Sequence, residues 1–199
     1  MASPCCDFLH GGNGIQFATT FEVRRRLKRI EDGRRQSRLH ERGRDVNDAI
    51  EIEVVSKVNG EIMEAMARLL PELFVSATVP TTEQVQEIAA SPCTTLLLAR
   101  DRTQARRIVG SLTLAVFRIP TGVRAWIEDV VVDSTVRGKG IGEALCREAL
   151  GIAASRSART VELTSRSSRE AANRLYQRLG FEIRETNVYR YSIRSGAAG

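Results

Sequence analysis

The fold of this chain is decided by residues 127–142, which read IEDVVVDSTVRGKGIG. The stretch begins with residues 127–132, whose later positions are apolar on both faces, as expected for a central strand. Glycines at positions 138, 140 and 142 then precede a segment with helical periodicity. A helix start carries unpaired N–H groups and a partial positive charge, so this order of strand, glycine turn and helix predicts an anion site.

The spacing of the glycines separates this loop from two other phosphate-binding loops. A Walker loop has a lysine directly after its second glycine and a hydroxyl residue after that, whereas Lys139 precedes Gly140. A dinucleotide-binding loop has the spacing Gly-x-Gly-x-x-Gly at the start of a βαβ unit, whereas these glycines are spaced Gly-x-Gly-x-Gly. Arg137 and Lys139 add cationic donors. The loop predicts a phosphorylated ligand, with a turn that serves packing alone as the alternative.

The segments on either side of this loop predict a mixed α/β domain over residues 51–199. Before the loop, apolar runs predict strands, and two stretches with helical spacing predict helices, the second capped by Thr81 or Thr82. Gly180 supplies a helix stop. The predicted strands are 52–55, 95–99, 108–114, 126–132, 161–164, 181–185 and 188–193, and the predicted helices are 59–74, 82–90, 141–155 and 169–179.

Residues 1–50 form a separate basic extension in this prediction. They hold ten Arg or Lys residues against seven Asp or Glu residues, and they include one short amphipathic stretch at 23–30. Glycines at 11, 12 and 14 interrupt the pattern. We expect a flexible, solvated arm. The alternative is an arm that contacts nucleic acid, although it lacks the interleaved aromatic residues typical of such segments.

Composition excludes several classes of protein. The four cysteines and two histidines have no spacing typical of a disulfide framework or a zinc site, so no metal is expected. No apolar run approaches the ~20 residues that a membrane span needs, and none is typical of a signal peptide. We therefore expect a cytoplasmic protein. The net charge of +6 suits an anionic small molecule without requiring nucleic acid.

At two blocks the chain resembles the GNAT superfamily of N-acetyltransferases. The family signature Gln/Arg-x-x-Gly-x-Gly/Ala is matched by Arg137, Gly140 and Gly142, and residues 168–181 end in the family pattern Leu-Tyr-x-x-x-Gly-Phe. The resemblance covers residues 51–193. It implies a mixed, mostly antiparallel sheet of six to seven strands, flanked by about four helices and splayed at its central strands to admit acetyl-coenzyme A.

The resemblance also implies which residues hold acetyl-coenzyme A. The backbone of Val130, Val131 and Val132 would bond the pantetheine arm as an added strand. Many family members place an asparagine seven residues before the tyrosine of the second block, where this chain has Arg169, so Asn173 is the substitute candidate. The residues implied at the diphosphate are Arg137, Gly138, Lys139, Gly140, Ile141, Gly142 and Glu143.

Acetyl transfer needs a proton for the leaving thiolate and a base for the amine. Tyr176 occupies the family position of the general acid, and a packing role is its alternative. Glu128 is the favoured base, directly or through water, with Glu162 as the second candidate. Because side chains of a strand alternate, we expect Asp129 to point to the opposite face from Glu128.

The sequence therefore predicts an enzyme that acetylates a primary amine on a small molecule or a peptide. The alternative is a catalytically silent acyl-coenzyme A-binding module that regulates a partner. The acceptor side is expected at residues 59–91 and 186–187, with most of its carboxylates on solvated helix faces. The sequence leaves open the acceptor and the oligomeric state, a homodimer included. The carboxylates concerned are Glu61, Glu64, Glu72, Glu83 and Glu87.

Overall fold

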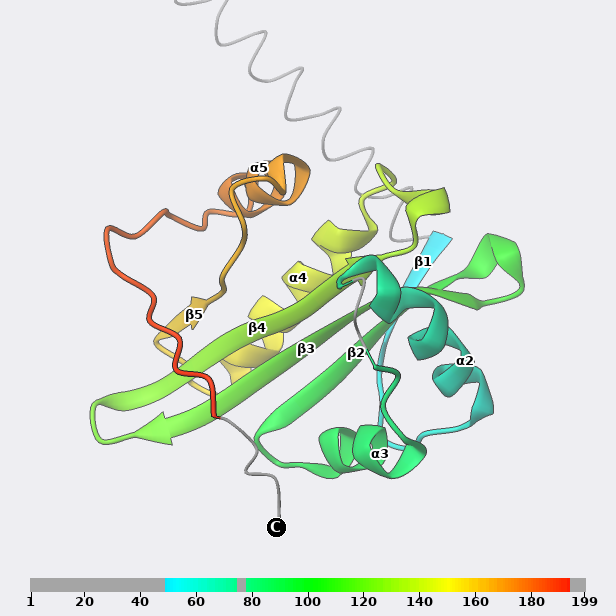
Figure 1. Cartoon of the computed structure of the whole chain (residues 1–199), viewed down its shortest axis with the longest axis horizontal. Helices are drawn as coiled ribbons and strands as arrows, with labels where there is room; N and C mark the ends of the chain where they lie inside the picture. Colours follow the sequence, from blue (N-terminus) through cyan, green and yellow to red (C-terminus); the bar gives the residue numbers. More distant parts are fainter. Residues whose placement is uncertain (1–48, 75–77, 194–199) are drawn as a thin grey trace, which may run out of the picture. The chain divides into compact units, whose positions relative to one another are not determined.

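The computed structural model of the chain describes residues 49–74 and 78–193 (Figure 1). The predicted basic extension, with its amphipathic stretch, lies outside the described residues apart from its last two positions. In chain order the elements are β1 (Ile50–Val54), α2 (Gly60–Leu69), η1 (Leu70–Glu72), α3 (Thr82–Ala90), β2 (Thr94–Asp101), η2 (Arg102–Gln104), β3 (Arg107–Ile119), β4 (Gly122–Val132), η3 (Ser134–Val136), α4 (Ile141–Ser155), β5 (Thr160–Glu162) and α5 (Glu170–Arg178).

The strands form one sheet in the order β1-β2-β3-β4-β5. Neighbouring strands are antiparallel except for β4 and β5, which run parallel. This confirms the predicted mixed, mostly antiparallel sheet with four α-helices. Within the described residues, however, the sheet has five strands rather than six to seven.

The two strands predicted after α5 are wrong. Residues 181–193 carry no strand, and beyond Phe181 the large apolar side chains among them are 77–90% exposed. Alternating apolar residues form a strand only where a neighbouring strand supplies hydrogen bonds, and β5 offers an edge of only three residues. An ion pair between Arg184 Nη1 and Glu162 Oε1, at 3.0 Å, joins this segment to β5. The exposed side chains are Ile183, Val188, Tyr189, Tyr191 and Ile193.

Local capping signals account for the helix ends. The Asn59 side chain accepts a hydrogen bond from the Ile62 N–H at the start of α2. Thr81 and Gln84 bond each other's backbone N–H groups in a capping box at the start of α3. Gly180, at φ +91°, follows the end of α5 in the left-handed conformation. The predicted cap of α3 and the predicted stop are confirmed.

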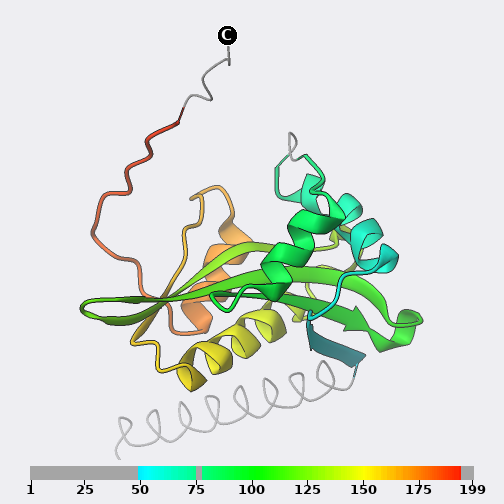
Figure 2. The same cartoon turned by 90° about the horizontal axis from the view of Figure 1, so that it is seen from below.

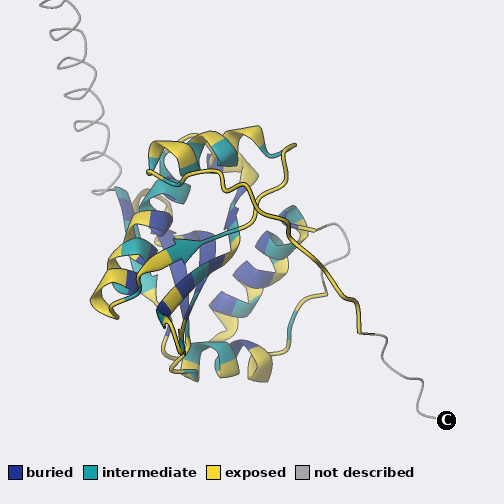
Figure 3. Ribbon diagram, turned by 90° about the vertical axis from the view of Figure 1, so that its left-hand side faces the viewer, coloured by how far each residue is buried: buried dark blue, intermediate teal, exposed yellow. Residues whose placement is uncertain are grey.

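The helices cover the sheet in two layers (Figure 2). Helices α2 and α3 pack on one face through a cluster that includes Leu69 and Leu98, while α4 packs on the other through Leu145 and its neighbours. Tyr176 and Leu179 place α5 on the α4 side. The buried residues line the inner sides of these elements, whereas the C-terminal segment is exposed along its length (Figure 3).

An extra residue in β4 reverses the alternation of that strand. Thr113 pairs with Glu128 and Ser111 with Val131, so β4 uses one more residue than β3 over this step. Asp129 lies at the shift with φ +52°, as in a β-bulge. Before the shift Ile127 faces the α4 cluster. After it Val131 joins the α2 cluster instead.

Strands β4 and β5 separate beyond Trp126. The pairing joins residues 124–126 only to residues 160–162, although β4 continues to Val132. The second half of β4 therefore has no strand partner on the β5 side among the described residues. This confirms the predicted splay, which lies between the last two strands of the five-stranded order rather than at its centre.

Gly110 provides a test of how tightly β3, β4 and α4 pack. A Cβ built there would lie 2.9 Å from the Val131 carbonyl oxygen and 3.3 Å from side chains of Ile141 and Leu145. We expect Gly110→Ala to lower the free energy of unfolding by about 1–3 kcal/mol, measured by urea denaturation.

Gly151→Ala is the matched control, because a Cβ there meets nothing within 4 Å and the position lies inside α4. Alanine favours a helix over glycine, so this variant should gain up to about 1 kcal/mol. Equal stability of the two variants would contradict the close approach at Gly110.

Candidate functional site

Asp133 fixes the turn that leaves β4. Its Oδ1 accepts hydrogen bonds from the Thr135 backbone N–H at 3.0 Å and from the Thr135 hydroxyl at 2.6 Å. Its Oδ2 pairs with Arg68 of α2, and with Arg107 Nη2 at 3.2 Å. The bond from the Thr135 hydroxyl, helped by the two arginines, outweighs desolvation and holds the pKa of Asp133 below its usual range. The start of the loop is thus tied to both β3 and α2.

The glycine turn then presents an uncapped helix start. Gly138 at φ +81° and Gly140 at φ +79° are left-handed, a conformation that other residues adopt only with strain. Gly140 precedes α4, and no side chain of the described residues caps the first N–H groups of that helix. Gly142 has a packing reason as well, because a Cβ there would lie 3.2 Å from Leu175 of α5. The backbone fits an anion at this place.

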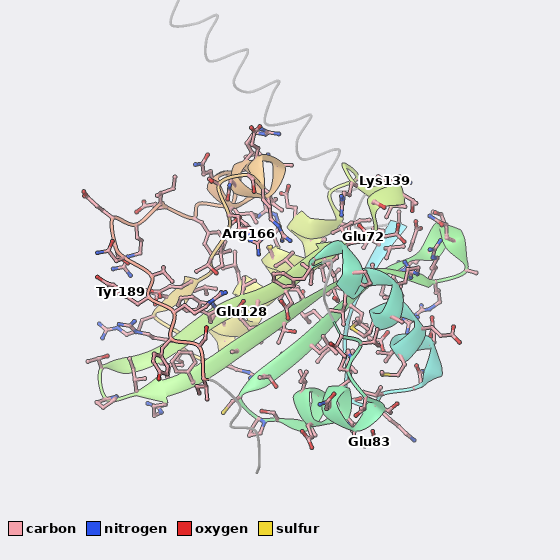
Figure 4. The ribbon with its side chains drawn as sticks, in the orientation of Figure 1. Glu72, Glu83, Glu128, Lys139, Arg166 and Tyr189 are labelled. Atoms are coloured by element: carbon pink, nitrogen blue, oxygen red, sulfur yellow. The ribbon has the colours of Figure 1, made fainter. Side chains whose placement is uncertain are left out.

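The side chains of the loop divide between solvent and protein. Arg137 donates from Nε to the Val132 carbonyl at 3.1 Å and from Nη2 to Glu72 Oε2 at 2.5 Å. Lys139 is exposed at the turn (Figure 4). Ile141 is buried in the α4 cluster, and the Glu143 side chain pairs with Arg147 one helical turn along.

Glu72 is a site residue that sequence reasoning missed. It was grouped with carboxylates on solvated helix faces, whereas its Oε1 accepts from the Ser134 N–H and from the Ser134 hydroxyl, both at 3.1 Å. Glu61 of the same group pairs with Arg100. No spacing in the sequence links Glu72 to residues 134–137, because the contact joins positions more than sixty residues apart.

The peptide groups of Val130, Val131 and Val132 alternate in direction at the end of β4. The Asp133 N–H donates to the Val109 carbonyl at 2.9 Å, so residue 133 directs its peptide groups toward β3. Peptide groups alternate along a strand, so Val131 also bonds β3, and Val130 and Val132 face the open side. The Arg137 bond to the Val132 carbonyl lies on that side.

Tyr176 lies on α5 and packs into the α4 cluster. Its ring meets Phe181 edge to face, with ring centroids 5.9 Å apart. Burial, with Cys146 nearby, raises the pKa of Tyr176 to about 12. Its hydroxyl makes no hydrogen bond within the described part of the chain. The phenol is therefore neutral.

The carboxylates on β4 and β5 differ in their partners. Glu128 is exposed on β4 (Figure 4) and makes no ion pair with any described residue. Glu162, the second candidate base, is paired with Arg184. The opposite directions expected for Glu128 and Asp129 stay a prediction, because the β-bulge at Asp129 interrupts the alternation of β4 at this step.

The start of α5 is tied to η1. Arg169, in the family's asparagine position, donates from Nη2 to the Leu73 carbonyl at 2.9 Å. Asn173 donates to the carbonyls of Arg166 at 3.0 Å and Ser167 at 3.4 Å, which closes the turn before the helix. A coenzyme contact by Asn173 stays a prediction.

Neither a metal-binding cluster nor a membrane-crossing helix occurs among the described residues. They contain no group of three or more His, Cys, Asp or Glu side chains arranged to hold a metal ion. None of the helices in that part of the chain has the length and apolar character to cross a bilayer.

Several solved structures share the fold of this chain. An aminoglycoside acetyltransferase from an uncultured soil metagenomic sample, crystallised with trehalose, superposes with a TM-score of 0.65 at 20% identity, over 75% of this chain and 99% of that one. Glucosamine-6-phosphate N-acetyltransferase from Arabidopsis thaliana gives 0.58 at 20% identity, over 71% and 97%. An acetyltransferase of Trypanosoma brucei gives 0.58 at 25% identity, over 72% and 99%. These likenesses concern the fold.

The sequence comparisons identify the family. An uncharacterised N-acetyltransferase of Methanocaldococcus jannaschii is 43% identical over 61 residues, which is 31% of this chain. The match spans about a quarter of that curated relative, 27% of its length. Residues 61–181 match the model of the family described as "Acetyltransferase (GNAT) family", and this stretch includes the glycine loop and Tyr176. The chain belongs to the GNAT family of acetyltransferases.

Proposed function

We propose that this chain is an N-acetyltransferase that moves the acetyl group of acetyl-coenzyme A to a primary amine. One observation carries the proposal: an uncapped helix start follows, after one short loop, a strand edge that has no partner strand among the described residues. A helix start suits a diphosphate, and an open strand edge suits an extended arm that carries amide groups. Coenzyme A contains both, joined end to end.

The donor would be held mainly by the backbone. The amides of residues 138–143 face the diphosphate in this proposal, and Arg137 and Lys139 add charge. Val130 and Val132 offer their peptide groups to the pantetheine arm, whereas Val131 is bonded to β3. The Val132 carbonyl already accepts from Arg137 and has one lone pair left for the arm.

The chemistry would fall to side chains on the two sides of the sheet. Acetyl-coenzyme A supplies a thioester whose carbon the amine nitrogen attacks, so that an N–C bond forms and the C–S bond breaks. Glu128, on the side away from α4, accepts the proton that the amine loses, directly or through water. Tyr176, on the α4 side, donates its phenolic proton to the leaving sulfur.

Two observations favour an enzyme over a silent acyl-coenzyme A-binding module. Tyr176 is protonated at neutral pH, as any phenol is, and burial raises its pKa further, to about 12. Glu128 has no ion pair among the described residues, so a basic partner does not occupy it. A binding module would need neither feature.

The acceptor class is the least constrained part of the proposal. One similar structure, of an aminoglycoside acetyltransferase, was solved with sisomicin, and another is that of glucosamine-6-phosphate N-acetyltransferase. Both proteins are about 20% identical to this chain, so they justify a test panel rather than a choice. The panel should contain an aminoglycoside, an amino sugar phosphate and peptides with free amino groups.

The first test is binding and turnover by the wild-type protein. Calorimetry should detect acetyl-coenzyme A binding, and free-thiol detection should show release of coenzyme A with at least one amine of the panel. Binding without turnover across a broad panel would support the silent module. Absence of binding would end the proposal.

Tyr176→Phe tests the general acid. We expect kcat to fall about 100-fold while the affinity for acetyl-coenzyme A changes little, because the ring and its packing remain. The wild-type kcat should not decline with rising pH before about pH 11, since the phenol loses its proton only near a pKa of about 12.

Tyr191→Phe is the matched control, because Tyr191 is 90% exposed and loss of its hydroxyl should leave kcat unchanged. Equal losses of affinity and kcat in Tyr176→Phe would assign Tyr176 to packing. A decline in the wild type with an apparent pKa of about 10, the ordinary phenol value, would contradict the buried environment.

Glu128→Gln tests the base. The amide keeps the size of the side chain but cannot take the amine proton, so kcat/KM for the amine should fall roughly tenfold or more at neutral pH. The affinity for acetyl-coenzyme A should not change. Glu182→Gln is the control, because Glu182 is exposed and unpaired within the described residues. If Glu162→Gln gave the larger loss, the role would pass to Glu162.

A further inference from the structure

Glu72 binds the phosphate loop as an anion would. One carboxylate oxygen accepts the Ser134 N–H and hydroxyl, and the other accepts from Arg137 Nη2. The side chain is 21% exposed, so these contacts take up most of its surface. Figure 4 shows Glu72 beside the turn that carries Lys139. Glu72, which belongs to the helices expected on the acceptor side, thus contacts the loop that is proposed to hold the donor.

The backbone of Glu72 is held from two directions. On one side Leu69 and Leu73 are buried in the α2 cluster at 0% and 8% exposure. On the other side, α5 and the turn before it reach back. Arg169 donates to the Leu73 carbonyl, and the Arg166 guanidinium lies 5.6 Å from the centre of the Phe74 ring. The carboxylate therefore acts from a fixed base.

The contact with Glu72 orients Arg137 and leaves N–H groups of its guanidinium available for a ligand. Its guanidinium donates to the Val132 carbonyl and to Glu72, and most of its N–H groups have no partner among the described residues. Arg137 is 57% exposed, so without these bonds it would sample many rotamers. Held by both, it lies where the open edge of β4 meets the glycine turn.

We propose that Glu72 is a positioning residue: it orients Arg137, and with it the start of the loop, toward the diphosphate of coenzyme A. This inference rests on the proposed function. Two effects of Glu72 oppose each other, because its negative charge repels the diphosphate while its bonds fix the guanidinium. The pair is half-exposed and screened by water, which weakens the repulsion. Orientation is the larger effect.

The test compares ligands with and without the diphosphate in wild type and Glu72→Gln. Glutamine keeps an acceptor for Ser134 but loses the charge-assisted bond to Arg137. We expect the Kd for coenzyme A, measured by calorimetry, to rise about fivefold, the upper end for an exposed ion pair. The kcat/KM for acetyl-coenzyme A should fall by the same factor with kcat unchanged, whereas kcat/KM for S-acetylpantetheine should stay the same.

Two further variants make the result specific. Glu148→Gln removes an exposed carboxylate of α4 that is unpaired within the described residues, and should change neither ligand's values. In an Arg137→Gln background, Glu72→Gln should have no additional effect, because its target is gone. Unfolding by urea checks that each variant is folded.

The outcomes separate a failure of the Glu72 positioning role from a failure of the proposed function. Unchanged or tighter coenzyme A binding in Glu72→Gln would overturn the positioning role. Equal losses with acetyl-coenzyme A and S-acetylpantetheine would overturn it too, since they would indicate general damage to the site. If the wild type binds no coenzyme A, the proposed function fails and this inference with it. If the wild type binds but the variant is normal, only the inference fails.

Discussion

An extra residue at Asp129, held at φ +52°, moves every later position of β4 by one against β3. Aspartate tolerates this left-handed conformation better than a bulky or β-branched residue, and the valines that follow gain from the shift. Val131 enters the α2 cluster, while Val130 and Val132 turn their side chains to the α4 cluster and their peptide groups to the open side. Without the extra residue, the side chains of Val130, Val131 and Val132 would each face the opposite side of the sheet. The candidate donor site then loses its strand edge.

The same strand delivers the charged part of the site. Asp133 ends β4 and binds Arg68 of α2, and four residues later Arg137 binds Glu72 of η1. Two ion pairs of opposite polarity therefore connect α2 and η1 to the loop: α2 supplies the cation of one pair, and η1 supplies the anion of the other. The Arg137–Glu72 pair is half-exposed and is worth little alone, whereas Asp133 of the other pair is buried. Together, however, the two pairs fix the direction in which the loop leaves the sheet. They also place Glu72 next to Arg137 and Lys139, which are proposed to bind phosphate.

Local signals in the sequence predicted local structure well. The bounds of α4 agree residue for residue with the prediction of 141–155, because a glycine turn, apolar spacing and a polar end all act within one helix. The cap at Thr81 and the stop at Gly180 are equally local. What failed depends on distant partners: residues 181–193 have strand-like alternation but no long edge to pair with, and Glu72 looked like any other carboxylate at a helix end. The bulge at Asp129 has no periodic signature at all.

The difference between backbone and side-chain recognition explains why the donor can be inferred and the acceptor cannot. A helix start and an open strand edge bind their ligand through N–H and C=O groups, which every sequence that adopts this fold provides. Structures about 20% identical share the fold that presents such groups. An acceptor is distinguished by side chains that pack against it or reject it, and these vary at such identity. On this chain, the surface proposed for the acceptor includes Glu128 and residues 186–187. The donor is thus selected through the backbone, whereas the acceptor is selected through side chains.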